Sequence, residues 1–99
     1  MASSFNADLS KWDVSRVTDM REMFLYASSF NADLSKWDVS QVTDMSFMFA
    51  EAHSFKQELC GAAWVNSNAD KTDMFYGSPG WISRTVSGAW SIDIILFYF

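Results

Sequence analysis

Two short stretches of the chain alternate between polar and apolar residues. Residues 11–15 read Lys-Trp-Asp-Val-Ser, and the same five residue types recur at 36–40. Successive side chains of a β-strand point to opposite faces, so this pattern predicts a short, half-buried strand in each stretch. We expect Trp12 and Trp37 to point inward, and the lysine, aspartate and serine side chains to point outward.

The spacing of apolar residues changes after each predicted strand, at 20–27 and again at 45–52. The apolar residues there are Met20, Met23, Phe24 and Ala27, with Met45, Met48, Phe49 and Ala52 in the equivalent places. Positions i, i+3, i+4 and i+7 share one face of an α-helix. Asp19 and Asp44 precede these segments, as N-cap residues do. The pattern therefore predicts a short helix in each segment.

Strand and helix patterns belong to one 25-residue repeat. Residues 3–27 and 28–52 differ only at five aligned positions, 16/41, 21/46, 22/47, 25/50 and 26/51, which leaves 20 of 25 identical. Residues 53–80 are a degenerate third unit, and together the three units form a predicted domain over 1–80. Residues 81–99 are either a degenerate fourth half-unit or a C-terminal cap or tail.

The period of 25 residues falls within the range of about 20–29 that is typical of leucine-rich repeats. The sequence therefore predicts an α/β fold, a leucine-rich-repeat-like solenoid with one short strand and one short helix per turn of about 25 residues. In this fold Trp12 would lie over Trp37, and Phe24 over Phe49.

Composition limits the function. Twelve acidic and seven basic residues give the 99-residue chain a net charge of −5. Without a basic cluster this argues against a nucleic-acid partner. The most apolar run, 92–99, is far shorter than the about 20 residues of a membrane-spanning helix. The N-terminus has no secretory signal pattern. We expect a soluble chain without membrane insertion.

The outward positions of the two predicted strands would stack into rows of polar side chains. These candidate partner-binding residues are Lys11, Asp13, Ser15, Lys36, Asp38 and Ser40. A face of repeated polar side chains is the usual working surface of a repeat protein. The alternative interpretation is a solvated face on which the lysine and aspartate rows offset each other.

Stacked aspartates raise the question of calcium. The three pairs are Asp8 with Asp33, Asp13 with Asp38, and Asp19 with Asp44. A hard cation would relieve their repulsion, but helix capping and turn hydrogen bonds also account for them, and no calcium-loop motif is present. The methionines have the helical spacing of core residues rather than of a soft metal site. We therefore expect no metal and no cofactor.

Few other side chains suggest a function. His53 and Cys60, the only histidine and the only cysteine, are a weak catalytic pair because no nucleophile signature accompanies them, and a single cysteine rules out an internal disulfide. Leu25, Tyr26 and Phe47 fall off the predicted inward helix stripe. They would either add exposed apolar surface that marks a contact site or pack against an adjacent turn.

The signature F-N-x-D-L-S-x-W-D-V-S-x-V-T-D-M-x-x-M-F resembles the BspA-like leucine-rich-repeat surface proteins, with the 25-residue repeat of mycoplasma-type lipoproteins. The resemblance covers 3–52 fully and 53–80 in degenerate form. It implies a non-catalytic protein-binding module, part of a cell-surface or adhesion protein, with an extracellular or surface protein as partner.

Alternatives to this function remain. The missing signal peptide suits an intracellular repeat scaffold for protein–protein interaction, located in the cytoplasm. A third hypothesis is a hydrolase that uses Cys60 and His53. We expect the chain not to be an enzyme. The oligomeric state, the partner and the full number of repeats stay open.

Overall fold

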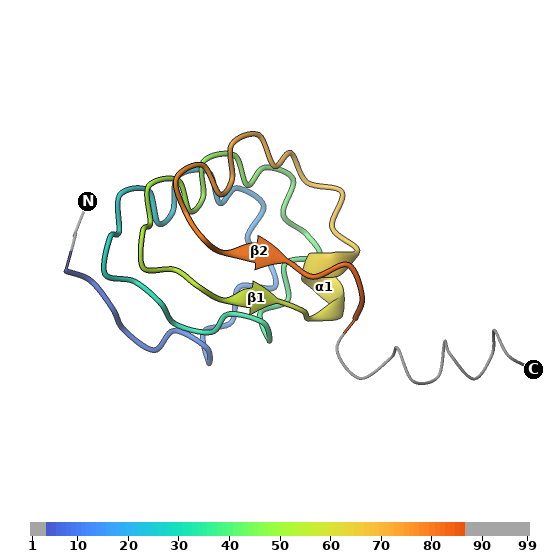
Figure 1. Ribbon diagram of the computed structural model, residues 1–99. Coiled ribbons are helices and arrows are strands. Elements are labelled where there is room, and N and C mark those ends of the chain that lie inside the picture. Colours follow the sequence, from blue (N-terminus) through green and yellow to red (C-terminus); the bar gives the residue numbers. More distant parts are fainter. Residues whose placement is uncertain (1–3, 87–99) are drawn as a thin grey trace, which may run out of the picture.

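The computed structural model describes residues 4–86 (Figure 1). Within this range strand β1 covers Glu58–Leu59, helix α1 covers Ala62–Val65 and strand β2 covers Trp81–Ile82. The two strands are parallel, with Glu58 opposite Trp81 and Leu59 opposite Ile82. The rest of the described chain is turns, bends and isolated bridges.

The predicted α/β leucine-rich-repeat-like solenoid, with one strand and one helix per repeat, is therefore wrong. Residues 4–86 form a small globule with almost no regular secondary structure, and neither 11–15 nor 36–40 is a strand. The predicted helices at 20–27 and 45–52 are likewise absent. The single helix α1 and both strands lie in the third repeat and beyond it, where the sequence pattern is weakest.

Three consecutive β-turns take the place of each predicted helix. In the first repeat the carbonyl oxygens of residues 20, 22 and 24 accept the N–H groups of residues 23, 25 and 27, at N···O distances of 3.0–3.3 Å. The third residues of the first and last turns, Glu22 and Tyr26, have φ of 59° and 61°. A left-handed residue at this place characterises the type II turn and cannot continue a right-handed helix.

The intervening N–H groups explain why these turns form. They point to the next repeat, where Glu22 N donates to the Ser46 oxygen at 3.0 Å and Phe24 N to the Met48 oxygen at 2.8 Å. The same contacts recur between the second and third repeats, where Phe49 N donates to the Met74 oxygen at 2.8 Å. Hydrogen bonds between neighbouring segments thus replace the bonds that a helix would make within itself, and in Figure 1 these segments lie side by side.

Aspartates interrupt the predicted strands. Asp38 Oδ1 accepts the backbone N–H of Ser40 at 3.1 Å, and Asp13 Oδ1 accepts that of Ser15 at 3.0 Å. Such Asx turns offer the backbone a local partner in place of a strand neighbour. Asp19 makes the same contact with the Arg21 N–H at 3.0 Å, so it resembles an N-cap although no helix follows.

Most of the predicted core is present. Phe24 stacks on Phe49 with ring centroids 5.3 Å apart, and Phe49 stacks on Phe75 at 5.5 Å. A second column joins Phe30 to Phe55 at 5.9 Å. The methionines at 20, 45, 48 and 74 are buried in this core as predicted. The stacked rings bury large apolar surfaces at every repeat, which is the main stabilising contribution.

One predicted core residue lies elsewhere. Trp37 and Val39 are buried, but Trp12 is 56% exposed, so the expectation that its side chain points inward is wrong. The reason is that each buried tryptophan packs against the repeat before it. The indole N–H of Trp37 donates to the Leu9 carbonyl oxygen at 2.9 Å. In the described chain no repeat lies on the corresponding side of Trp12.

The segment after residue 80 begins by pairing with the third repeat. Strand β2 pairs with strand β1, and the Ser83 N–H donates to the Leu59 carbonyl oxygen at 3.0 Å. Gly80 packs directly against the ring of Phe55, and any side chain at that position would collide with it. The remainder of the predicted half-unit or cap, from 87 to 99, lies outside the described residues.

Candidate functional site

The six residues predicted from the polar rows lie at the surface, but their aspartates are engaged locally. Hydrogen bonds from the side chain and backbone of Ser15 lower the pKa of Asp13. Ser40 lowers the pKa of Asp38 in the same way, while the charge of Asp13 acts in the opposite direction. The two carboxylates are therefore close enough to interact, yet each is committed to its own turn. Lys11 and Lys36 are exposed.

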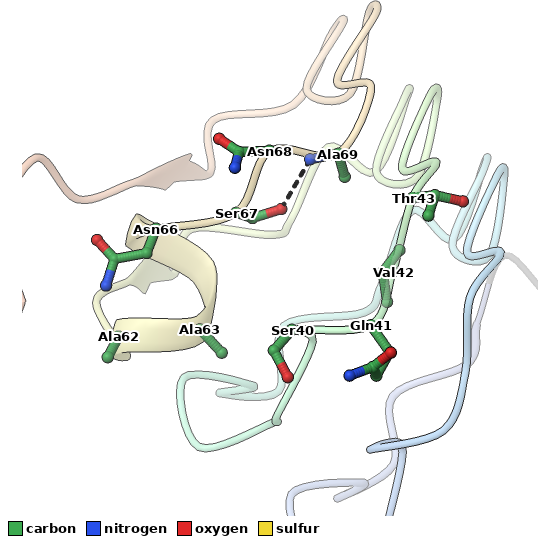
Figure 2. Close-up of a pocket in the computed structure, with 10 residues that line it drawn as sticks. All are labelled: Ser40, Gln41, Val42, Thr43, Ala62, Ala63, Asn66, Ser67, Asn68 and Ala69. Atoms are coloured by element: carbon green, nitrogen blue, oxygen red, sulfur yellow. Dashed lines mark hydrogen bonds between the residues drawn. The ribbon is translucent and has the colours of Figure 1, made fainter.

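A surface groove of about 640 Å³ lies beside Ser40, between the second and third repeats (Figure 2). One wall is the segment 40–43 and the other is α1 with residues 66–69. The lining residues are Ser40, Gln41, Val42, Thr43, Ala62, Ala63, Asn66, Ser67, Asn68 and Ala69. These side chains are small or uncharged, so the groove offers neither a charged anchor nor an aromatic one.

The groove depends on a change in the length of the third repeat. Leu34 and Trp37 are three residues apart, whereas Leu59 and Trp64 are five apart. The two additional residues fall in the segment that contains α1, and Ala62 and Ala63 of α1 line one wall of the groove. Sequence reasoning missed this groove, although the changed tryptophan spacing was the signal for it.

A second surface carries exposed aromatic side chains. We call it the turn face and define it as residues 20–27, 45–52 and 71–78. Tyr26, Phe47 and Tyr76 lie on it with exposures of 58%, 38% and 63%. Tyr26 and Phe47 therefore follow the first of the two predictions made for them, whereas Leu25 is half-buried. Tyr76 was missed, although it aligns with Leu25 in the degenerate third repeat.

Backbone geometry makes two of these aromatics unusual. Tyr26 has φ of 61° and Phe47 has φ of 57°. In the third repeat the position equivalent to Tyr26 is occupied by Gly77, with φ of 71°. Glycine is the residue that adopts this conformation without a steric penalty, and bulky residues in it are outliers.

Phe47 shares a surface depression with three charged side chains. A shallow depression of about 530 Å³ is lined by Asp19, Arg21, Glu22, Ser46 and Phe47. The guanidinium of Arg21 donates to both carboxylate oxygens of Asp19, and its Nη2 lies 2.8 Å from Oδ2. Hydrogen bonding to Asp19 raises the pKa of Arg21, and the reciprocal contact lowers the pKa of Asp19. An aromatic ring and an oriented ion pair thus share one small area.

The structure does not bring His53 and Cys60 together as partners. His53 Nε2 lies 2.6 Å from the Glu51 carboxylate, and the Cys60 sulfur lies 3.8 Å from the Ser35 hydroxyl. Within residues 4–86 no three His, Cys, Asp or Glu side chains are arranged to hold a metal ion. No helix of the described range is long and apolar enough to cross a membrane.

Comparison with known proteins gives one match. A family model described as "Mycoplasma protein of unknown function, DUF285" matches residues 1–87. No curated protein and no solved structure matches the chain. The resemblance to BspA-like surface proteins stays a prediction.

Proposed function

The chain belongs to DUF285, a family of Mycoplasma proteins of unknown function, and from its surface we propose that it is a non-catalytic protein-binding module. In this proposal the turn face makes the contact. The partner is a protein, as expected from the resemblance to surface and adhesion proteins. A cell-surface or extracellular location follows from the same resemblance, with an intracellular scaffold in the cytoplasm as the alternative.

The observation that carries this proposal is the conformation of Tyr26 and Phe47. Their left-handed backbone costs about 1–2 kcal/mol each relative to a glycine-like residue. The side chains of Tyr26 and Phe47 remain 58% and 38% exposed, so burial of apolar surface offsets this cost less completely at Tyr26 than at Phe47. A bulky aromatic side chain that disfavours the fold and faces solvent is explained by a role in recognition, because backbone strain is commonly stored at functional sites.

The residue types on the turn face agree with this role. Tyrosine, tryptophan and arginine are the residues that most often dominate binding energy at protein interfaces. The Arg21–Asp19 pair beside Phe47 would provide oriented polar contacts around an aromatic anchor. Hydrogen bonds between successive repeats hold the face in one conformation, so little ordering entropy would be lost on binding.

His53 Nε2 contacts the Glu51 carboxylate and the Cys60 sulfur contacts the Ser35 hydroxyl, so the described contacts do not join the two residues of the weak catalytic pair. The polar rows at Lys36 and Asp38 and the groove at Gln41 are the competing binding surfaces. Three variants therefore test the proposal: Tyr26→Asn with Phe47→Asn on the turn face, Lys36→Ala with Asp38→Ala on the polar rows, and Gln41→Ala in the groove.

The experiment probes an array of purified extracellular proteins with the labelled wild-type chain and then with each variant. Asparagine suits the replacement because it tolerates the left-handed conformation. We expect the turn-face variant to lose at least about 30-fold in affinity for the partner found, which is the effect of losing even one of two hot-spot residues. The other two variants should bind as the wild type does.

Two results would refute the proposal. One is a wild-type chain that binds no protein of the array. The other is a partner whose affinity falls only in the polar-row or groove variant. Thermal unfolding of each variant distinguishes lost contacts from lost folding, and the turn-face variant should melt close to the wild-type temperature.

A further inference from the structure

The net negative charge of the described residues gathers on one surface. The turn face, together with the aspartate that precedes each of its three segments, carries six acidic and two basic residues, a net charge of −4. The rest of residues 4–86 carries five acidic and five basic residues, which leave no net charge. A surface of one sign attracts a partner of the opposite charge. The six acidic residues are Asp19, Glu22, Asp44, Glu51, Asp70 and Asp73.

Both basic side chains on this surface are already engaged. The Arg21 guanidinium pairs with Asp19, with Nη2 2.8 Å from Oδ2, and its Nε lies 3.8 Å from an Asp44 carboxylate oxygen. The Lys71 ammonium donates to two backbone carbonyl oxygens at 2.7 and 3.2 Å. In the described chain no other lysine or arginine forms an ion pair with this surface. Most of its negative charge is therefore left for a partner.

Two unpaired carboxylates flank the exposed ring of Phe47. The Glu22 N–H donates to the Ser46 oxygen at 3.0 Å. The Phe47 N–H donates to the Thr72 oxygen, also at 3.0 Å. These bonds align residues 22, 47 and 73 across three neighbouring segments, at about the 4.8 Å spacing of sheet strands. All three side chains are exposed, and within residues 4–86 the Glu22 and Asp73 carboxylates make no hydrogen bond or ion pair. The phenyl ring therefore stands between two carboxylates.

The left-handed positions of the turn face hold one glycine and otherwise only aromatic or acidic residues. Glycine and asparagine suit this conformation best, and aspartate alone among the residue types found here comes close to them. No lysine or arginine occupies such a position in the part of the chain that the structure describes. The side chains that the backbone favours least are thus the ones that would attract a cation. They are Glu22, Tyr26, Phe47, Glu51 and Asp73, with φ between 50° and 61°.

Resting on the proposed function of the turn face, we propose that this surface recognises a basic segment of its protein partner. An arginine of that segment lies on the Phe47 ring, between Glu22 and Asp73. A guanidinium stacks on an aromatic face and donates hydrogen bonds to carboxylates from the same plane, whereas an ammonium supplies the charge without the planar fork. The chain already contains one such pairing, because the Arg21 guanidinium donates to both carboxylate oxygens of Asp19.

The probe is a fluorescein-labelled synthetic peptide of repeated Arg-Gly-Ser triplets, titrated with the intact chain at about 0.15 M ionic strength and followed by anisotropy. We expect saturable binding with a Kd below about 1 mM. The same peptide with citrulline in place of arginine keeps the shape of the side chain without its charge, and it should not bind. A Lys-Gly-Ser peptide should bind more weakly than the arginine peptide, because lysine lacks the fork of donors.

Variants of the chain locate the contact. Glu22→Gln with Asp73→Asn removes both flanking charges at nearly constant size and should weaken binding of the arginine peptide by about tenfold. Phe47→Asn should weaken it by about threefold, the effect of losing an exposed cation–π contact. Asp13→Asn with Asp38→Asn is the matched control, since it removes the same charge outside the turn face and keeps the oxygen that each turn needs. Salt screening should limit its effect to less than about twofold.

Three results would overturn this inference. They are an arginine peptide that shows no saturable binding below about 1 mM, a citrulline peptide that binds equally well, and two double variants that weaken binding equally. A lysine peptide that binds as tightly as the arginine peptide would overturn the assignment to arginine. The peptide comparison uses the wild-type chain, so its outcome does not depend on the folding of any variant.

The partner found on the protein array distinguishes this inference from the proposed function. If that partner is lost in the turn-face variant but retained by Glu22→Gln with Asp73→Asn, the proposed function stands and the recognition of arginine is refuted. If the array yields no partner while the arginine peptide binds and depends on Glu22 and Asp73, the proposed function fails and the arginine site stands. Loss of the array partner in both double variants of the turn face supports both.

Discussion

Replacing Glu22 by glycine should stabilise the protein, although glycine normally weakens a helix. Glu22 is exposed and has φ of 59°. Its carboxylate makes no hydrogen bond or ion pair within residues 4–86, and only a minor attraction to Arg21 is lost on replacement. The side chain thus contributes little, and the backbone conformation decides the sign of the effect.

The magnitude follows from two opposing contributions. Glycine relieves about 1–2 kcal/mol of left-handed strain. It also costs about 0.5–1 kcal/mol, because the unfolded chain gains conformational freedom at that position. The net expectation is a gain of about 0.5–1 kcal/mol in the free energy of unfolding. If residues 20–27 formed the helix that their apolar spacing suggests, Glu22→Gly would instead cost about 1 kcal/mol.

Urea unfolding followed by tryptophan fluorescence measures this difference. With a slope of about 1–1.5 kcal/mol per molar urea, the midpoint should rise by about 0.5 M. Arg21→Gly is the matched control, because Arg21 is the exposed neighbour with negative φ and pairs with Asp19. Its midpoint should fall. A lower midpoint for Glu22→Gly as well would refute the turn conformation on which the account rests.

Three further expectations concern the core, acid stability and the third repeat. Trp37→Phe should cost about 2 kcal/mol in urea unfolding, because it leaves a cavity and removes the buried hydrogen bond to the Leu9 oxygen. Hydrogen bonds from Ser40 lower the folded-state pKa of Asp38. The stabilising contribution of Asp38 is therefore present above the unfolded pKa of about 3.9 and is lost as the pH falls through the lower folded pKa. The melting temperature should drop below about pH 4, and it should drop less steeply in Asp38→Asn. Gly80→Ala should cost about 1–3 kcal/mol, since its methyl group would collide with the Phe55 ring, and an unchanged melting temperature would contradict that packing.

The sequence alone predicts the 25-residue repeat and most of the buried core positions. Phe24, Phe49 and the methionines at 20, 45, 48 and 74 occupy the interior because apolar side chains at every third or fourth residue face one side in a series of turns as well as in a helix. The periodicity identifies the buried positions without identifying the backbone that buries them. It cannot tell whether an N–H group bonds within its own segment or to the next repeat.

One sequence signal for the turns was available in the third repeat. Gly77 stands where the first two repeats have Tyr26 and Glu51, and all three residues have positive φ. A glycine at that place indicates a left-handed position, but two non-glycine residues obscured it. The exposure of Trp12 had no local signal, because Trp12 and Trp37 have the same sequence neighbours and differ in the described segment that packs against the ring.

The candidate surfaces were predicted in part. The spacing of Tyr26 and Phe47 singled them out as possible exposed residues, whereas Tyr76 and the groove beside α1 depend on the altered length of the third repeat. The rows at Lys11 and Lys36 stay a prediction that the binding variants address. Their aspartates already have a structural task, since each accepts hydrogen bonds from the serine two residues later.

Amide hydrogen exchange tests the central claim most directly, namely that alternate N–H groups of the turn face are donated to the following repeat. Phe24 and Phe49 donate to the Met48 and Met74 oxygens, whereas the equivalent N–H of Phe75 has no acceptor in the described chain. The account predicts slow exchange at Phe24 and Phe49 and fast exchange at Phe75. In a helix the Phe75 N–H would bond to the carbonyl four residues earlier, so equal protection at all three positions would contradict the account.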